Sequence, residues 1–348
     1  MLRVYTLDES SQWDCVVCSF AKYDVYWLSG YVKAFKIHGD GTPLLFHFEA
    51  GATKGIHVVM QRDVADDKRF NGIVSKGDYW DFVSPYGYGG WLIEGDRAEA
   101  LFSAYRAWIE EHNVVSEFVR FHPVMRNHEK CGSFYEINQM GEIVCMDLAS
   151  PDGIWEQVTS KNRNMIRKAI KNGVRIFHGN FPRAYEVFKE IYDVTMERDC
   201  ANRYYFFGKE FYQSVLEDLP YNAQVFWAEK DRAVIAASII LCANGYMNYH
   251  LSGSRKEYAT FAPSNLLLYE AARWGNANGC KSFYLGGGVG SGDDGLLRFK
   301  KSFNRNTSGH FFVGKRIYDK EKYVALSEKR GMETLDEEGN GFFPAYRK

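Results

Sequence analysis

The sequence predicts an α/β protein built from two similar halves. Its 348 residues are more than one hydrophobic core usually needs, and they suit two domains. Short alternating segments typical of strands are interleaved with segments of helical periodicity. A helix ending at Tyr105–Trp108 leads into a strand with Phe118, and a helix with Ala272–Trp274 leads into a strand with Phe283. This shared order of elements indicates a duplicated α/β unit.

The first half is predicted to span residues 1–148. A short strand comes first, and helical stretches follow it as far as Phe35. The loop Ser84–Gly90 combines proline, glycines and tyrosines, and Asp96 is predicted to cap an amphipathic helix that runs through His112. Further strands are expected at Leu44–Phe48, Gly55–Gln61, Tyr79–Val83, Ser116–Phe121 and Ile143–Leu148.

The second half is predicted to span residues 149–316, because Ser150–Gly153 is a turn and helix-start signal. Alternating runs at Ala223–Glu229 and Ala233–Cys242 indicate an antiparallel pair of strands. The other expected strands are Gly245–Gly253 and Ser282–Leu285. Helices are expected at Ile154–Thr159, Asn162–Asn172, Phe181–Asp199, Lys209–Leu219, Pro263–Asn278 and Leu296–Phe303.

Composition limits the partners and the compartment. The formal net charge of -1 gives no global basic excess, so any anion site must be local and DNA is not an expected partner. Seven scattered cysteines suggest reduced thiols in the cytoplasm, and the first residues show no signal-peptide pattern. No metal-ligand spacing, H-E-x-x-H or G-x-S-x-G motif occurs, so we expect neither a metal nor a tightly bound cofactor.

A glycine-rich stretch, Gly286–Gly295, joins the last predicted strand to a basic helix. Its Gly290–Gly295 segment fits the spacing of nucleotide-binding loops, but leucines stand where a P-loop needs Lys and Ser/Thr. Asp293 and Asp294 would also repel a pyrophosphate. We therefore expect one of these aspartates to cap the helix Leu296–Phe303 instead.

Two basic helical stretches are candidate anion sites. In the first, Lys300 lies between Arg298 and Lys301, and it is either part of a solvated face or aimed at an anion or a developing oxyanion. The second, Lys161–Arg175, holds six basic residues and no acid, with Arg163, Arg167 and Lys171 on one helix face. A solvated face normally mixes signs. The second stretch therefore predicts a polyanion partner such as phosphate, pyrophosphate or RNA backbone.

Two further stretches suggest ligand binding. Arg198 and Arg203 lie near Tyr204, and arginine forks suit phosphate, although a structural ion pair explains them equally well. Tyr86 and Tyr88 alternate with glycines after a proline, an arrangement more typical of a ligand-facing loop than of a core.

Four motifs occur in the same order as in the Fem family of aminoacyltransferases, which build peptidoglycan interpeptide bridges. They are DFVSPYGYGG at 81–90, SKNRNMIRKAIKNGVRI at 160–176, TMERDCANRYYFF at 195–207 and LGGGVGSGDDGLLRFKKSFN at 285–304. The chain also resembles GNAT-superfamily proteins with a BioF2-like acetyltransferase domain. The resemblance covers most of the chain and is most specific at PYGYGG and at the FKxxF ending.

The resemblance implies two tandem domains of the GNAT-like (acyl-CoA N-acyltransferase) fold, with mixed sheets flanked by helices. It implies that residues 317–348 return to the first domain, and that an acyl or aminoacyl group is transferred to a primary amine. Lys300, after Phe299, matches the family's lysine near the acyl donor, and Tyr249 matches a tyrosine facing the cleft. One of the two arginines 198 and 203 matches the residue that holds acceptor phosphate.

The resemblance also implies the substrates and partners. Fem enzymes take aminoacyl-tRNA as donor and a lipid- or UDP-linked muropeptide as acceptor, so tRNA, a phosphorylated glycan or muropeptide, and a membrane-bound lipid precursor are expected partners. GNAT acetyltransferases bind CoA through [QR]-x-x-G-x-[GA], and Arg255–Ser264 has no glycine there, which makes acyl-CoA the less favoured donor. Two alternatives remain: an acyl-CoA-dependent N-acetyltransferase acting on an amino sugar or another small amine, and a non-catalytic protein that binds a phosphoglycan or RNA.

Overall fold

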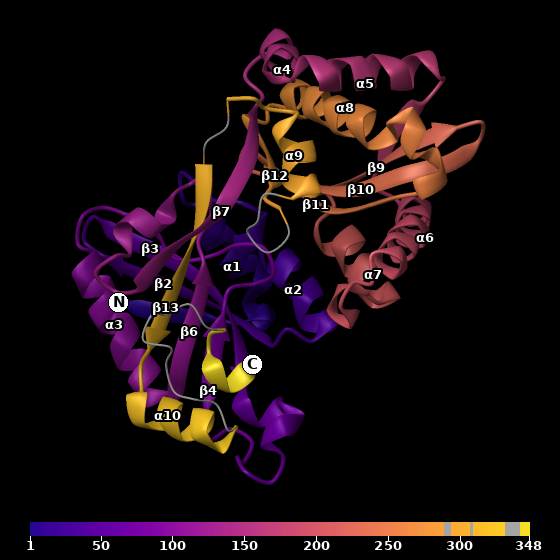
Figure 1. Cartoon of the computed structure of the whole chain (residues 1–348). Coiled ribbons are helices and arrows are strands. Elements are labelled where there is room, and N and C mark those ends of the chain that lie inside the picture. Colours follow the sequence, from indigo (N-terminus) through magenta and orange to yellow (C-terminus); the bar gives the residue numbers. More distant parts are fainter. Residues whose placement is uncertain (289–293, 307–308, 331–341) are drawn as a thin grey trace. The chain divides into compact units, whose positions relative to one another are not determined.

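The computed structural model of the chain describes residues 1–288, 294–306, 309–330 and 342–348. It contains two compact units (Figure 1). Unit 1 comprises Met1–Met140 and Phe311–Lys348, and unit 2 comprises Gly141–His310. The division falls inside strand β7 (Glu136–Asp147), whereas the boundary expected at residue 148 lies just beyond the end of that strand. Residues Val289–Asp293 of the glycine loop lie outside the described part.

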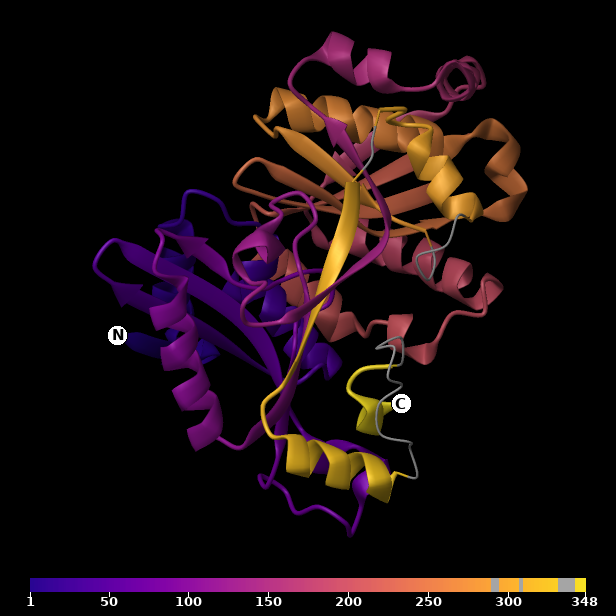
Figure 2. The same ribbon diagram turned by 60° about the vertical axis from the view of Figure 1, so that its left-hand side comes forward.

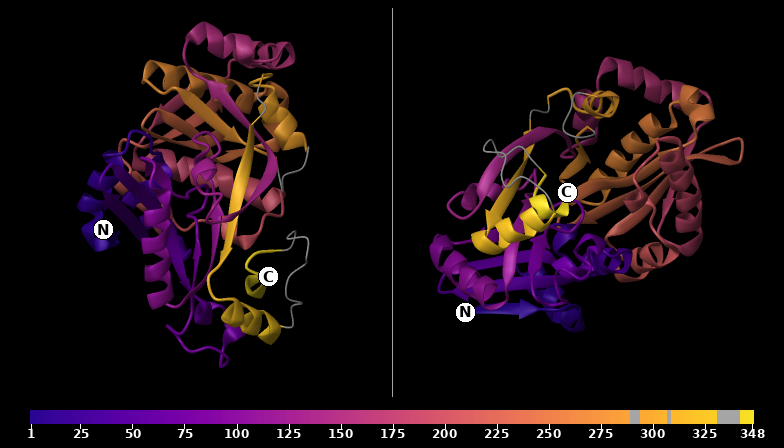
Figure 3. Two further views of the ribbon diagram at one scale, coloured as in Figure 1. Left: turned by 90° about the vertical axis from the view of Figure 1, so that its left-hand side faces the viewer. Right: turned by 60° about the horizontal axis from the view of Figure 1, so that its bottom comes forward.

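Unit 1 contains a mixed sheet in the order β1-β2-β3-β4-β6-β13. Neighbouring strands are antiparallel except β4 and β6, which are parallel, and the short β5 pairs with β3. Figure 3 shows β13 running alongside β6. The strands are β1 (Leu2–Tyr5), β2 (Thr42–Ala50), β3 (Thr53–Asp63), β4 (Trp80–Val83), β5 (Leu92–Glu94), β6 (Val114–Arg120) and β13 (Gly309–Ile317).

Helix α3 (Ala98–Glu111) covers one face of this sheet (Figure 2). Its Tyr105 is fully buried and meets the Phe46 ring of β2 edge-on at 4.9 Å. The predicted Asp96 cap is wrong: the N-cap is Arg97, and no side chain caps the helix. The backbone N–H of Arg97 instead donates to Thr53 Oγ1 at 3.0 Å, so β3 holds the start of the helix. The other helices of unit 1 are α1 (Ser10–Cys18), α2 (Ser29–His38) and α10 (Lys320–Lys329).

Unit 2 repeats the pairing pattern of unit 1. Its strands follow the order β8-β9-β10-β11-β12-β7, and only β11 and β12 are parallel. In each unit one helix, α3 or α8, connects the two parallel strands. The sequence-based prediction of two similar α/β units is therefore confirmed. The new strands are β8 (Arg175–Gly179), β9 (Ala223–Lys230), β10 (Ala233–Ala243), β11 (Tyr246–Ser254) and β12 (Ser282–Gly286).

Helices cover both faces of the second sheet (Figure 1). The α5 and α8 side encloses a core that includes Ile166, Leu268 and Phe283, all fully buried. The opposite side carries α6 and α7. The helices are α4 (Pro151–Gln157), α5 (Ser160–Lys171), α6 (Pro182–Arg198), α7 (Lys209–Asp218), α8 (Pro263–Ala277) and α9 (Gly295–Lys301).

Candidate acyl-transfer site

The two parallel strands of unit 2 diverge after a short paired segment. Tyr246–Asn248 of β11 pair with Ser282–Tyr284 of β12, and β11 then continues to Ser254 without that partner. Beyond the paired segment, no strand in the described part of the chain pairs with β11 on this side. The β11–β12 ladder therefore ends in a gap at this point.

A β-bulge sets the side chains of β11 at this gap. The register against β10 shifts because His250 is an extra residue between Tyr249 and Leu251. In a regular strand, positions 249 and 252 would face opposite sides of the sheet. The extra residue places them on one side, where the Tyr249 hydroxyl donates to Ser252 Oγ. Burial raises the pKa of Tyr249, and hydrogen bonds with Ser252 and Ser238 oppose that rise.

Lys300 projects from α9 toward this same gap. Asp294 caps α9 as predicted, since its Oδ1 accepts from the Leu297 N–H at 2.8 Å. Lys300 Nζ donates to the carbonyl oxygen of Gly287 at 2.7 Å, just beyond β12, and lies 5.9 Å from the Tyr249 ring centroid. A Cβ at Gly286 would approach Nζ to 3.0 Å, so the glycine leaves room for the ammonium.

Residues that follow Lys300 anchor the C-terminal end of α9. Lys301 forms an ion pair with Glu142 on β7, and Asn304 Nδ2 donates to the carbonyl oxygen of Cys145 at 2.6 Å. Phe299 is half-buried and packs edge-on against Phe303 at 5.3 Å. The helix can therefore hold its lysine in one place without help from a bound ligand.

The Lys300 ammonium is buried, with 8% of the residue exposed. Desolvation lowers its pKa to about 8, and the nearby Asp294 carboxylate partly opposes this. An ammonium has three N–H donors, and the described residues supply one acceptor, the Gly287 carbonyl oxygen. The other donors can stabilise a negative oxygen that develops on a substrate in the gap.

This pKa predicts how activity depends on pH. If transfer needs the charged ammonium, kcat should fall as the pH rises through about 8, because the proton is lost there. Arginine stays charged over that range. A Lys300→Arg variant should therefore show lower activity without the alkaline decline. The measurement is kcat against pH for both proteins, and an equal decline in both would contradict the assignment.

Three residues beside this site had no signal in the sequence. The hydroxyls of Ser252 and Ser238 form hydrogen bonds with Tyr249, and Ser238 is 2% exposed. His250, the bulged residue, has its pKa lowered to about 3 by burial, so its imidazole is neutral at pH 7. A bulge depends on the register of two strands far apart in sequence, and for this reason the local pattern could not reveal it.

The basic face of α5 lies on the α8 side of the sheet, and no acidic partner for its arginines occurs among the described residues. The guanidinium groups of Arg163 and Arg167 lie 5.9 and 5.1 Å from the Trp155 ring centroid. Their hydrogen bonds go to Ser160 and Asn164 at 3.4 and 3.2 Å. No contact between these arginines and Lys300 occurs among the described residues, so their role in binding stays a prediction.

Arg198 and Arg203 differ in how they are held. Arg198 makes two hydrogen bonds to Asp199, at 2.7 and 3.0 Å, and another to the Ser254 carbonyl oxygen at the end of β11. Arg203 is exposed on a short 3-10 helix beside Tyr204 and has no acidic partner within the described residues. Because Arg198 is already neutralised, Arg203 is the better candidate for a phosphate ligand.

The tyrosines of the Ser84–Gly90 loop lie in unit 1. Tyr86 is half-buried and stacks on Phe35 at 5.3 Å, and Tyr88 is 8% exposed with an edge-on contact to Tyr26 at 5.6 Å. The loop also extends the parallel pairing of β4 and β6, since Gly89 donates to the Arg120 carbonyl oxygen at 2.7 Å. The gap that is open in unit 2 is thus closed by backbone pairing in unit 1.

The loop that would hold a CoA pyrophosphate runs from Arg255 to Ala262, before α8. The Arg255 guanidinium is tied to Glu190 at 2.5 Å and to the Val234 carbonyl oxygen at 3.1 Å. The positive charge of Arg255 is therefore already paired with the Glu190 carboxylate. A loop without glycine, whose arginine is engaged, fits a CoA pyrophosphate poorly.

The described part of the chain contains no group of three or more His, Cys, Asp or Glu side chains that could hold a metal ion. A separate search over those residues finds no helix with the length and apolar character needed to cross a membrane.

Comparison with known proteins agrees with this geometry. Residues 160–301 match the family described as "Acetyltransferase (GNAT) domain". A crystal structure of FemX superposes with a TM-score of 0.67 at 13% identity, covering 93% of this chain and 99% of that chain. No curated protein matches the sequence.

Two further solved structures share the fold. The C-terminal domain of a putative lysylphosphatidylglycerol synthetase from Agrobacterium fabrum has a TM-score of 0.56 at 12% identity, covering 88% of this chain and 91% of that chain. A conserved protein of unknown function from Bacteroides thetaiotaomicron has a TM-score of 0.57 at 9% identity, with coverages of 90% and 98%. A GNAT domain implies acyl-CoA as co-substrate. The chain therefore has a tandem GNAT-like fold that superposes on FemX, and residues 160–301 of its second unit match a GNAT domain.

Proposed function

We propose that the protein transfers an aminoacyl or acyl group to a primary amine of a peptidoglycan precursor. The observation that carries this proposal is the buried Lys300 ammonium at the gap between β11 and β12, in a chain whose fold matches FemX over 93% of its length. The position of Lys300 also agrees with the Fem-like FKxxF ending of the sequence.

In the proposed reaction the neutral amine attacks the carbonyl carbon of the activated donor. The carbonyl π electrons move onto oxygen, and the N–H groups of Lys300 stabilise that oxyanion. The intermediate then collapses, forming the amide and breaking the ester or thioester bond to the leaving group. The amine's proton passes to the Tyr249 oxygen while the phenol donates to Ser252, and from there it reaches solvent or the leaving group. No covalent enzyme intermediate is needed.

The donor we favour is aminoacyl-tRNA. Support comes from the Arg255 guanidinium, which is bound to Glu190 and so is not available to a CoA pyrophosphate. The GNAT match favours the second candidate, an acyl-CoA-dependent N-acetyltransferase acting on an amino sugar or another small amine.

A transfer assay with two donors tests the proposal. The protein would be incubated with UDP-linked muropeptide and either a mixture of aminoacyl-tRNAs or acetyl-CoA, and the products read by mass spectrometry. A muropeptide heavier by one amino-acid residue, formed only with the tRNA mixture, supports the proposal. Acetylation from acetyl-CoA alone supports the second candidate. No transfer from either donor, together with thermal stabilisation by the muropeptide, indicates a binding protein.

The acceptor phosphate provides a further prediction. Arg203→Ala should raise the KM for a UDP-linked acceptor about tenfold or more with little change in kcat, because a charge-assisted hydrogen bond to phosphate contributes about 1.5–3 kcal/mol. Arg198→Ala serves as the matched variant, since its charge is neutralised by Asp199. Steady-state kinetics on both variants checks this. A larger KM change for Arg198→Ala would reverse the assignment.

A further inference from the structure

A surface of unit 2 combines positive charge without acids and an exposed apolar side chain. Residues 158–185 contain seven Lys and Arg residues and no Asp or Glu. Within the described residues Arg183 pairs with Glu186, and the other six have no acidic partner. Positive charge that is not balanced by acidic residues over this segment favours an anionic partner. The six are Lys161, Arg163, Arg167, Lys168, Lys171 and Arg175.

Ile170 lies on the same stripe of α5 as two of these arginines. Arg163, Arg167 and Ile170 follow the spacing i, i+4, i+7, which brings them to one face of the helix. Although Ile166, one turn earlier, is fully buried, Ile170 is 56% exposed. An isoleucine left in water between arginines gains free energy if an apolar group covers it.

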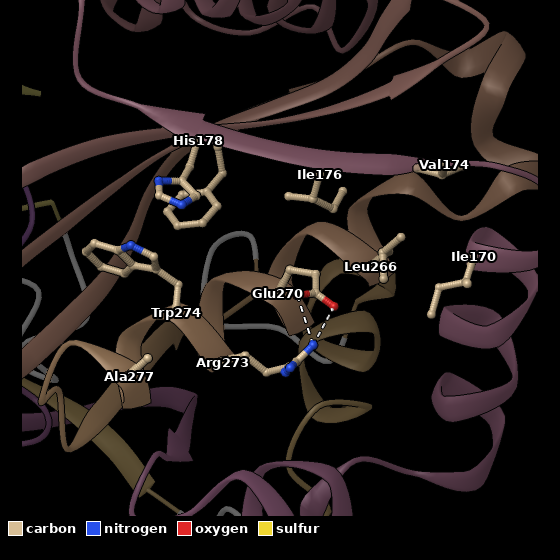
Figure 4. Close-up of a pocket in the computed structure, with 10 residues that line it drawn as sticks. Ile170, Val174, Ile176, His178, Leu266, Glu270, Arg273, Trp274 and Ala277 are labelled. Carbon is tan, nitrogen blue, oxygen red and sulfur yellow. Dashed lines mark hydrogen bonds and ion pairs between the residues drawn. The ribbon is translucent and has the colours of Figure 1, made fainter.

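Ile170 also stands at one end of a groove of about 620 Å³ between α5, β8 and α8 (Figure 4). The end near Ile170 is aliphatic, the ion pair between Glu270 and Arg273 at 3.2 Å lies midway along the groove, and the aromatic Trp274 lies toward the other end. The lining residues of α8 run from Leu266 to Ala277, which spans about 16 Å at 1.5 Å per residue. The groove is lined by Ile170, Val174, Ile176, His178, Phe226, Leu266, Glu270, Arg273, Trp274 and Ala277.

The aliphatic end favours an anionic lipid surface over single-stranded RNA as the partner. A single RNA strand bound without sequence preference needs basic groups and exposed aromatic faces on which its bases stack. Ile170, Val174 and Leu266 provide no such stacking surface, and they match the methylenes of a fatty acyl chain. Charge around an apolar groove is the arrangement expected for an anionic lipid surface.

We propose that the α5 face and this groove form a docking surface for an anionic phospholipid bilayer, with one acyl chain entering the groove. The basic side chains meet the head groups, and Ile170 is covered by the acyl region. This inference goes beyond the proposed transfer reaction and does not depend on the donor, because membrane binding is measured without any transfer step.

Co-sedimentation of the full chain with vesicles tests the charge component. Binding to vesicles of phosphatidylcholine with 30% phosphatidylglycerol should be at least tenfold tighter than binding to pure phosphatidylcholine, and it should weaken with salt. The double variant Arg167→Gln/Lys171→Gln should lose at least tenfold in affinity. The matched control Lys256→Gln/Lys281→Gln removes two exposed lysines elsewhere on unit 2 and should bind as the parent does. Equal binding to both vesicle types, or equal loss in both variants, overturns the proposal.

The apolar component has its own readouts. Ile170→Ser should weaken vesicle binding severalfold, and Val194→Ser, a change at a 42% exposed site on α6, should not.

Acyl chains brominated along their length should quench tryptophan fluorescence less in Trp274→Phe than in the parent protein, since Trp274 lines the groove. Quenching that is unchanged by Trp274→Phe overturns the groove assignment. If poly(U) displaces the vesicles and Ile170→Ser leaves both interactions intact, the surface binds RNA and the lipid proposal fails. Because both serine substitutions replace exposed side chains, folding should persist, and circular dichroism verifies it.

Discussion

Replacing Lys300 with methionine should lower kcat by about 10²–10³-fold, the usual cost of losing one oxyanion donor. Methionine keeps most of the side-chain volume and removes only the ammonium that donates to the Gly287 carbonyl oxygen. The protein should remain folded, since the lost group is a desolvated charge whose pKa burial has already lowered. The measurement is kcat and KM for both substrates, with a melting curve to verify folding.

A matched control lies on the same helix. Arg298→Gln removes one positive charge from the exposed side of α9, two residues before Lys300, and should change kcat by less than threefold. If Lys300→Met and Arg298→Gln reduce kcat equally, the basic helix acts through its overall charge and Lys300 has no special position. A threefold or smaller loss in Lys300→Met would remove the oxyanion role altogether.

Local patterns predicted much of the fold, since most helices and strands form where periodicity and turn residues indicate them. The Asp294 cap and the helix that carries Lys300 are examples, because both depend on residues a few positions apart. Strands β8 and β13 were not predicted. β8 is an edge strand with polar and charged residues, and its position depends on pairing with β9. β13 depends on pairing with β6, from which it is separated by most of the chain.

The candidate site was predictable only in part, for the same physical reason. Lys300 and Tyr249 could be selected by resemblance. In the structure Lys300 Nζ lies 5.9 Å from the centroid of the Tyr249 ring. The contact of Lys300 with Gly287, and the bulge that turns Ser252 toward Tyr249, depend on how strands pair across the sheet. Such registers are properties of the folded sheet and leave no mark in a window of neighbouring residues.

The second large effect concerns stability, and it centres on a buried carboxylate of unit 1. Glu117 on β6 is 1% exposed, and within the described part of the chain it has four hydrogen-bond partners from four other parts of the unit. Its Oε1 contacts His57 Nε2 at 2.5 Å, and its Oε2 accepts from the hydroxyls of Tyr105 and Tyr135, each at 3.1 Å. The Tyr318 hydroxyl, beyond β13, also donates to Oε2. Burial, followed by the charge of Glu117, raises the pKa of all three tyrosines well above the usual value.

Glu117→Gln should destabilise unit 1 by about 3–5 kcal/mol, the usual cost of removing one member of a buried charged network. The new amide NH₂ would face groups that are themselves donors, so at least one of the four loses its acceptor in a buried site. For a unit of this size the melting temperature should fall by about 10 °C, which differential scanning calorimetry measures. Glu129→Gln, which breaks an exposed ion pair with Arg126, should cost less than about 1 kcal/mol.

A double-mutant cycle separates the network from simple loss of packing. Tyr318→Phe in the parent protein removes one donor to Glu117 and should cost about 1 kcal/mol or more. In the Glu117→Gln background the same substitution should cost much less, or even stabilise, because it removes a hydroxyl that competes with the amide for an acceptor. Additive effects would mean that Glu117 and Tyr318 act independently. Coupling would show that the Glu117 carboxylate adds to the β13–β6 ladder in holding the C-terminal segment, which carries Tyr318, so that unit 1 depends on residues from both ends of the chain.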